Sequence, residues 1–234
     1  GELRAAGAIL DFAVDWAAVD ALEVADFGLK GRGLRAARDI APGEVLIVQR
    51  PRCSAQMSKG DLTMSIDYEN RAAIDHTKVK LMAQVTSAVA EDALLASMVD
   101  ALCDGSGAVP PLLPLEAMLD RLSPRVLPLL RQHPEFFPAA ERLEVGQAQV
   151  SGVLDINCHG HRPGDGGAKG RNTQLYPAIS LMNHARSPNC AYRPLSSPAQ
   201  PLALVLVAAM RVAAGDELTV SYGDEETVRR KWGV

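Results

Sequence analysis

The chain has 234 residues, of which 47% are hydrophobic and 4% aromatic, and its formal net charge at pH 7 is -4. This length allows a sizeable core in one domain, or in one domain with an insertion. Direct nucleic-acid binding is not expected, because it needs clustered Lys and Arg at phosphates and aromatic platforms for bases. A mildly acidic surface instead tolerates a cationic partner.

The sequence also gives no sign of a membrane segment or of a disulfide framework. No apolar run reaches the roughly 18 residues that a membrane span needs, and residues 1–9 lack the pattern of a secretory signal. The four cysteines form no C-x-x-C pair. Their wide spacing favours a reducing compartment, cytoplasmic or nuclear, over a disulfide scaffold or a zinc finger.

Short strands and turns dominate the first part of the chain. Residues 8–19 fit either a short helix or the lead-in to a strand. A glycine-rich turn is predicted over residues 28–33, and a second turn over residues 41–44. Strands are predicted at residues 21–27, 34–37 and 45–48.

The pattern of residues 34–48 recurs without a gap at residues 206–220. Gly215 then corresponds to Gly43, and several apolar positions match as well. Two β-hairpin turns of similar turn chemistry explain this pattern more simply than a duplication does. Both ends of the chain are therefore expected to be rich in strands.

Helices are predicted for the middle of the chain, where apolar residues follow helical spacing with few breakers. Composition changes from β to α near residue 66 and back near residue 151. We therefore expect an α+β chain in which a helical insertion, residues 66–150, lies between residues 1–65 and 151–234. The predicted helices are residues 77–103, 115–122, 124–132 and 138–150.

Within residues 175–190, an apolar run is followed by polar side chains that could bind a ligand. Asn183 offers amide donors and an acceptor, and His184 offers a switchable nitrogen, which together suit a polar small molecule. A strand that ends in a turn is the structural alternative. Before them, residues 162–172 are rich in glycine and polar, which predicts a loop.

Other familiar site types fit less well. Gly31 and Gly33 lack the third glycine and the following helix of a dinucleotide fingerprint. Cys158, His159 and His161 are zinc-ligand types, but no second closely spaced pair accompanies them, so a zinc site stays an alternative and no metal is expected.

Three motifs in order resemble those of SET-domain protein methyltransferases. They are Lys-Gly-Arg-Gly-Leu at residues 30–34, Asn183-His184 with Pro-Asn-Cys at residues 188–190, and Glu-Leu-Thr at residues 217–219 with Tyr222. The segment Tyr-Pro-Ala-Ile-Ser-Leu-Met-Asn-His that ends at His184 is similar to the SET-and-MYND branch, although the chain shows no MYND zinc finger. The resemblance implies a SET fold of short twisted β-sheets with a threaded C-terminal segment, interrupted by the helical insertion.

The resemblance also implies a function. It implies S-adenosylmethionine as the cofactor and a lysine side chain of a protein or peptide, histone or non-histone, as the methyl acceptor. Tyr222 corresponds to the catalytic tyrosine at the methyl-transfer channel, and His159 lies where an aromatic wall of that channel is expected. The residues that correspond to cofactor-binding positions are Lys30, Gly31, Arg32, Gly33, Asn157, Ser180, Asn183 and His184.

The chain departs from this branch after the central histidine. Arg186 stands where the branch often has a cysteine that serves a zinc site with a cysteine-rich tail, and no such tail occurs up to Val234. Weak turnover is therefore expected, and a catalytically weak or inactive SET-like protein-binding module is the alternative function. His159 in place of an aromatic residue leaves the number of methyl groups transferred open.

Overall fold

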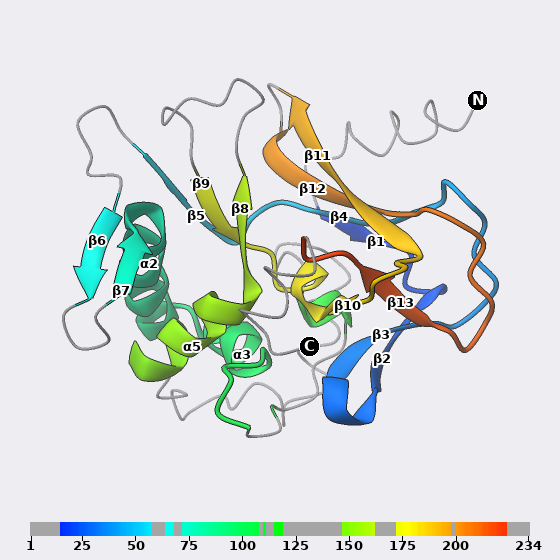
Figure 1. Ribbon diagram of the computed structural model, residues 1–234, viewed down its shortest axis with the longest axis horizontal. Coiled ribbons are helices and arrows are strands. Elements are labelled where there is room, and N and C mark those ends of the chain that lie inside the picture. The colour runs from blue at the N-terminus through cyan, green and yellow to red at the C-terminus, as the bar shows by residue number, and fades with distance from the viewer. Residues whose placement is uncertain are drawn as a thin grey trace. The chain divides into compact units, whose positions relative to one another are not determined.

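The computed structural model describes residues 15–57, 64–67, 72–107, 110, 115–118, 147–161, 172–197 and 200–223 (Figure 1). The chain divides into two compact units, which are described separately. The first unit comprises Gly1–Arg50, Leu112–His133 and Pro177–Val234, and the second unit comprises Pro51–Pro111 and Pro134–Tyr176. Within the described ranges, no helix is long and apolar enough to cross a membrane.

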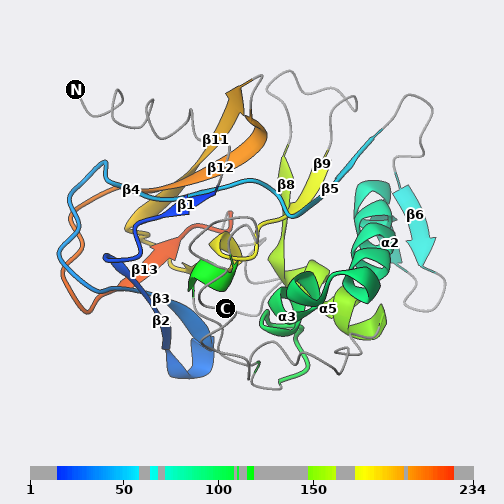
Figure 2. The same ribbon diagram turned by 180° about the vertical axis from the view of Figure 1, so that it is seen from behind.

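The described part of the first unit contains two four-stranded sheets, seen from behind in Figure 2. One has the strand order β1-β4-β12-β11 and the other β10-β13-β3-β2. Neighbouring strands are antiparallel except for β10 and β13, which are parallel. The strands are β1 (Trp16–Ala17), β2 (Leu22–Asp26), β3 (Arg32–Ala36), β4 (Val45–Gln49), β10 (Asn183–His184), β11 (Cys190–Ser197), β12 (Gln200–Ala208) and β13 (Glu217–Val220).

The strands predicted near the N-terminus are confirmed as β2, β3 and β4, with one change of boundary. β3 begins at Arg32, so Gly33 belongs to this strand and pairs with Ala25 rather than lying in the preceding turn. The turn itself is the short 3-10 helix η1 (Gly28–Lys30). Glycine is permitted in a strand but packs nothing, which is why its presence suggested a turn.

The two repeated segments are intertwined, so the hairpin interpretation of the repeat is wrong. β3 does not pair with β4 but with β13, and β12 pairs with β4. Arg35 lies opposite Glu217, and the corresponding residues of the repeat, Val207 and Val45, lie opposite each other. Each repeat therefore exchanges its strands with the other.

Backbone hydrogen bonds follow the same approximate two-fold relation. The Ala36 N–H donates to the Asp216 carbonyl, and the Ala208 N–H donates to the Glu44 carbonyl, both at 2.9 Å. These two bonds are equivalent when residues 34–48 are laid on residues 206–220. These equivalent hydrogen bonds show that the two segments share the same backbone hydrogen-bond pattern.

The centre of this arrangement is the bridge between Ile40 and Val212. Each residue donates its N–H to the carbonyl of the other, at 2.9 and 3.1 Å, and both side chains are buried. The turns that follow both use a glycine with positive φ, 83° at Gly43 and 91° at Gly215. Side chains with a Cβ rarely adopt this conformation, which explains why glycine occurs in both copies.

Gln49 at the end of β4 fixes the segment that leads into β10. Its side chain is 1% exposed, and its Nε2 donates to the Met118 carbonyl at 2.8 Å. Its Oε1 accepts from the Ala178 and Ile179 N–H groups at 3.1 and 3.2 Å. These bonds connect β4 to two short 3-10 helices, η2 (Leu115–Met118) and η4 (Ile179–Leu181). The predicted helix at residues 115–122 is a 3-10 turn in its described part.

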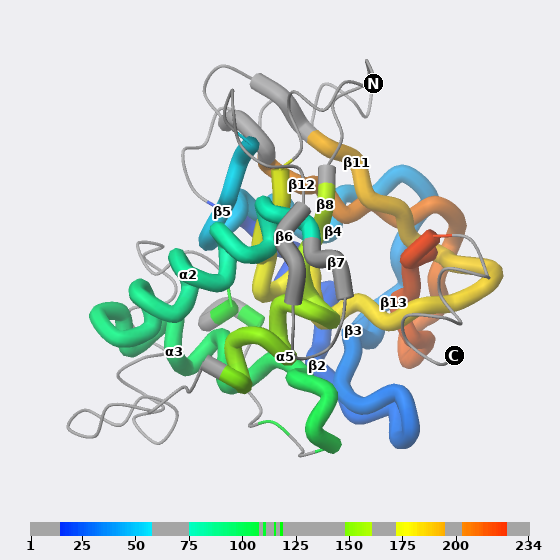
Figure 3. The backbone as a smooth tube through the Cα atoms, turned by 60° about the vertical axis from the view of Figure 1, so that its left-hand side comes forward, coloured from blue at the N-terminus to red at the C-terminus, as the bar shows by residue number. Residues whose placement is uncertain are grey.

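The second unit combines helices with small sheets. Its sheet has the order β5-β9-β8, and β6 and β7 form a separate antiparallel hairpin. The Thr77 and Thr173 hydroxyls hydrogen-bond at 2.6 Å, which joins α2 to β9, and Figure 3 shows α2, α3 and α5 close together. The elements are β5 (Cys53–Gln56), β6 (Met64–Asp67), β7 (Ala72–Asp75), α2 (His76–Glu91), α3 (Ala93–Asp100), α5 (Gln147–Asn157), β8 (Cys158–His161) and β9 (Asn172–Leu175).

The single helix predicted over residues 77–103 is wrong, because Asp92 divides it into α2 and α3. Asp92 has an extended backbone, and its carboxylate accepts from the Leu94 and Leu95 N–H groups, both at 3.1 Å. An aspartate in this role is an N-cap that starts a new helix. In the described part of residues 138–150, α5 begins at Gln147 and continues to Asn157. The predicted helix at 124–132 and the predicted loop, apart from Asn172 in β9, lie outside the described residues.

Candidate functional site

The glycine-rich turn places Lys30 at the edge of the first unit's second sheet. Gly28 and Gly31 have positive φ angles of 64° and 70°, which glycine adopts without strain. The turn closes because the Phe27 N–H donates to the Gly31 carbonyl at 2.8 Å. Lys30 then reaches Glu217 of β13, with 2.5 Å between its Nζ and the Glu217 Oε2.

Gly33 is the point at which this segment meets the central motif. A Cβ on Gly33 would lie 2.6 Å from the Asn183 Nδ2 and 3.0 Å from the Phe27 ring. Real Cβ atoms essentially never approach so closely, so a side chain at this position would force Asn183 or Phe27 to move. Gly33 and Asn183, 150 positions apart in the sequence, are therefore in direct contact in the fold.

The central and C-terminal motifs are joined by strand pairing. β10 and β13 run parallel, with Asn183 opposite Thr219 and His184 opposite Val220. The Ala185 N–H continues this ladder by donating to the Val220 carbonyl at 3.0 Å. Because β13 also pairs with β3, it lies between the two other motif segments.

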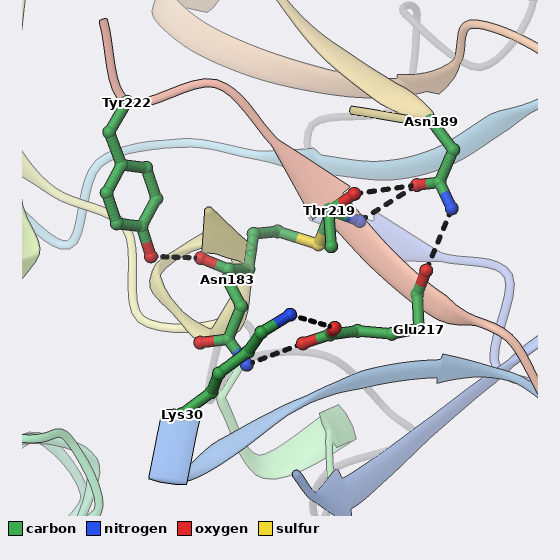
Figure 4. Close-up of polar contacts among 7 residues, drawn as sticks. Lys30, Asn183, Asn189, Glu217, Thr219 and Tyr222 are labelled. Atoms are coloured by element: carbon green, nitrogen blue, oxygen red, sulfur yellow. Dashed lines mark hydrogen bonds and ion pairs between the residues drawn. The ribbon is translucent and has the colours of Figure 1, made fainter. Parts of the chain in front are cut away.

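Glu217 connects the three motif segments (Figure 4). Its Oε2 contacts Lys30, its Oε1 accepts from the Asn183 Nδ2 at 2.9 Å, and its carbonyl accepts from the Asn189 Nδ2 at 2.8 Å. The Glu217 side chain is 17% exposed, against 48% for Lys30. Asn189 in turn accepts from the Thr219 N–H at 2.8 Å, so a side-chain amide takes the place of a ladder bond beside β13.

Tyr222 follows β13 and folds back onto the central motif. Its hydroxyl donates to the Met182 carbonyl at 2.5 Å, and its N–H donates to the His184 Nδ1 at 3.2 Å. The His184 and Tyr222 rings lie 5.4 Å apart at an angle of 39°. Because Nδ1 accepts a hydrogen bond, a neutral His184 carries its proton on Nε2 and offers a donor there.

Cys190 and Tyr192 on β11 are desolvated, and Tyr192 is a neighbour of Tyr222. Burial raises the pKa of the Cys190 thiol to about 12, so this thiol is protonated at neutral pH. Desolvation also raises the pKa of Tyr192 on β11 well above its usual value, and the neighbouring Tyr222 and Cys190 add to the rise. A weakly hydrated neighbourhood of this kind favours neutral forms of ionisable groups.

The remaining predicted residues of the first unit lie on the same elements. Gly31 is the residue after η1, and Arg32 is the first residue of β3. Ser180 is the middle residue of η4, two positions before Met182. The structure thus brings together Lys30, Gly33, Asn183, His184 and Tyr222 through the contacts described above, and places Gly31, Arg32 and Ser180 on the segments that carry them.

Asn157 and His159 belong to the second unit. Asn157 ends α5, and its Nδ2 donates to the Cys103 and Val153 carbonyls at 2.7 and 2.8 Å. His159 on β8 packs edge-on against Tyr176, with ring centroids 5.5 Å apart. Their predicted roles toward the cofactor and the lysine stay predictions.

The zinc alternative finds no arrangement that supports it within the described residues. There, no group of three or more His, Cys, Asp and Glu side chains is placed to hold a metal ion. Cys158 and His159 are adjacent on β8, where neighbouring side chains point to opposite faces of the sheet.

Sequence reasoning missed the roles of Glu217, Asn189 and Tyr192. The first two stood within the quoted motifs, but a carboxylate that binds a lysine and an asparagine far away in the sequence has no local signal. Tyr192 stood two positions after Cys190, on the same face of β11 by strand alternation. Its nearness to Tyr222 depends on the pairing of distant strands.

The chain matches a known protein family over most of its length. A family profile described as SET domain matches residues 31–223. No curated protein matches the chain. Among solved structures, the chain is similar to a Plasmodium falciparum protein described as a "putative histone methyltransferase", with 11% sequence identity, 88% of this chain and 95% of that chain covered, and a TM-score of 0.35. The profile match, together with the small twisted sheets and the helices, confirms the α+β fold class expected from the sequence.

Proposed function

The chain belongs to the SET-domain family, and from this premise we propose that it is a protein-lysine methyltransferase that uses S-adenosylmethionine. The observation that carries the proposal is the convergence of the three motifs on β13. Gly33 touches Asn183, Glu217 holds Lys30 and Asn183, and Tyr222 returns to the central motif. We also propose that the chain belongs to the SET-and-MYND branch, because the segment that ends at His184 resembles that branch.

The residues present fit the proposed cofactor. Gly33 leaves room for the Asn183 amide, which a Cβ at this position would displace, so this glycine sets where Asn183 lies. Lys30 supplies a cation, Asn183 supplies an acceptor and His184 supplies an Nε2–H donor. These groups suit a nucleoside that carries an amino-acid end. When bound, S-adenosylmethionine would supply a methyl group already activated by a sulfonium.

The protein's part in such a reaction is alignment rather than strong acid or base chemistry. Tyr222 donates its hydroxyl hydrogen to the Met182 carbonyl at 2.5 Å, so toward a reacting amine and methyl group its oxygen would act as an acceptor of hydrogen bonds or C–H contacts. The phenol ring is oriented by its contact with His184. Tyr222 is therefore proposed to orient the lysine amine.

The incoming lysine must be neutral to attack, although its ordinary pKa is about 10.4. A desolvated surrounding disfavours the charged ammonium and so lowers that pKa. The desolvation that raises the pKa of Tyr192, a neighbour of Tyr222, supports such surroundings on that side of Tyr222. The protein thus favours the reactive form of the amine by excluding water.

Transfer of a radiolabelled methyl group from S-adenosylmethionine into protein lysines tests this proposal. We expect wild-type protein to label histones or another pool of lysine-rich proteins, and Tyr222→Phe to reduce labelling by at least about tenfold, because the Met182 contact that orients the ring is lost. S-Adenosylhomocysteine binding and thermal unfolding of the variant should stay close to wild type. Equal labelling by both proteins would remove Tyr222 from the mechanism.

A second candidate is a SET-like protein-binding module with weak or no turnover. The observation that favours it is Arg186, exposed after β10, where related chains often have a cysteine. This candidate predicts binding of S-adenosylhomocysteine without methyl incorporation into any lysine-containing pool. Label in methyl-lysine after hydrolysis of the product would decide against it.

A further inference from the structure

Both carboxylate oxygens of Glu217 are engaged by other side chains. Its Oε2 contacts the Lys30 Nζ at 2.5 Å, and its Oε1 accepts from the Asn183 Nδ2 at 2.9 Å. Its backbone carbonyl accepts from Asn189 at 2.8 Å, and its strand neighbour is Arg35. Arg35 pairs with Glu23, and the Glu217 carboxylate commits both oxygens to Lys30 and Asn183.

This commitment fixes the orientation of the Asn183 amide. An ionised carboxylate only accepts hydrogen bonds, so Asn183 must present its NH2 to Glu217 and its Oδ1 elsewhere. No residue in the described part of the chain donates to that Oδ1. Asn183 therefore offers a carbonyl acceptor on the side away from Glu217, and a glutamine at position 217 would remove the constraint.

Lys30 offers a positively charged donor, in contrast to the neutral acceptor of Asn183. Its side chain is 48% exposed, and Glu217 takes only one of its three N–H directions. Lys30 and Glu217 also cancel each other's charge. The pair of Lys30 and Asn183 thus combines a cation with a neutral acceptor at a locally neutral place, which matches a group that carries one carboxylate and one ammonium.

We propose that Glu217 is a positioning residue that turns Lys30 and Asn183 into a reader of a zwitterionic amino-acid end, with Lys30 for the carboxylate and the Asn183 Oδ1 for the ammonium. The inference rests on the proposed function, since the methyl donor carries such an end. The new element is that selectivity for the amino-acid end depends on Glu217, although Glu217 is not proposed to touch the ligand.

Two ligands that differ only at this end test the proposal by calorimetric titration. S-Adenosylhomocysteine has the amino-acid end, and 5′-methylthioadenosine has the same adenosine thioether without it. We expect wild-type protein to prefer S-adenosylhomocysteine, and Glu217→Gln to lower this preference at least about tenfold, the effect of losing one charge-assisted interaction. The affinity for 5′-methylthioadenosine should not change, whereas a general loss of structure would weaken both ligands.

Glu23→Gln is the matched control. Glu23 pairs with Arg35 at 2.8 Å on the same sheet and is 51% exposed, so its loss removes an ion pair without touching Lys30 or Asn183. The preference should equal that of wild type. If Glu217→Gln does not fold, as judged by thermal unfolding, the exposed Lys30→Met replaces it, and we expect the same loss of preference.

The outcomes separate this inference from the proposed function. If wild-type protein binds both ligands and Glu217→Gln or Lys30→Met keeps the full preference, the role of Glu217 is refuted while the cofactor site stands. If wild-type protein binds neither ligand, the proposed function fails and the inference fails with it.

Discussion

Single residues explain why the three motif segments meet where they do. Gly33 leaves no room for a side chain beside Asn183, and Glu217 of β13 binds the Asn183 amide. The residue types of this site were predictable from the sequence by resemblance to a family. Their partners were not, because Glu217 and Lys30 are 187 positions apart and no local pattern relates them.

Gly33→Ala should weaken binding of S-adenosylhomocysteine by at least about tenfold. The added Cβ would lie 2.6 Å from the Asn183 Nδ2, so Asn183 must move away from Glu217. Calorimetric titration measures the effect. The control is Gly160→Ala on β8, where a Cβ meets nothing within 4 Å, and binding should be unchanged. Similar affinities for both variants would show that the close approach has no part in binding.

Among the elements, those with strong local signals were predicted correctly and those set by tertiary contacts were not. The apolar run of β4 between turn residues suffices to identify a strand. The break between α2 and α3 was missed because Asp92 fits a helical pattern until its capping bonds to Leu94 and Leu95 are seen. The parallel pair β10 and β13 has no local signal, since parallel pairing joins distant segments.

Gln49→Leu should destabilise the protein by about 2–4 kcal/mol. The leucine has a similar size but leaves the Ala178 and Ile179 N–H groups and the Met118 carbonyl buried without their partner. Urea unfolding followed by circular dichroism measures the free energy of unfolding.

A suitable comparison for this change is Gln56→Leu, since Gln56 is exposed at the end of β5 and makes no hydrogen bond through its side chain within the described residues. It should cost less than about 0.5 kcal/mol. Equal stability of the Gln49→Leu and Gln56→Leu proteins would contradict a structural role for Gln49.

At the scale of the whole molecule, the repeated segments explain how the first unit is built. The first unit is built on the repeat of residues 34–48 and 206–220, whose sequence likeness was visible but whose exchange of strands was not. The exchange depends on contacts such as the bridge between Ile40 and Val212. The division into residues 1–65, 66–150 and 151–234 stays a proposal.

Stability should fall in acid because carboxylates in and beside the repeated segments form ion pairs with arginines. Arg38 lowers the pKa values of Asp20 and Glu44, chiefly through its side-chain hydrogen bonds, and Arg211 lowers that of Asp39 in the same way. A carboxyl whose folded pKa is depressed stabilises the protein above its unfolded pKa and loses that effect as the pH falls through the folded value.

Thermal unfolding between pH 7 and about pH 2.5 measures this loss, which should begin near the unfolded pKa values of about 4 and continue below them. Arg38→Gln should be slightly less stable than wild type at pH 7, because exposed ion pairs contribute little. The difference between the two proteins should vanish in acid. A difference that stays constant with pH would show that Arg38 acts through packing instead of charge.

Isothermal titration with S-adenosylmethionine tests most directly whether the convergence of motifs on β13 forms a cofactor site. We expect one equivalent to bind to the wild-type protein, and Asn183→Ala, which loses the contact with Glu217 and the proposed acceptor, to bind at least about tenfold more weakly. No binding by the wild-type protein, or equal affinity in the Asn183→Ala variant, would contradict the assignment of this site.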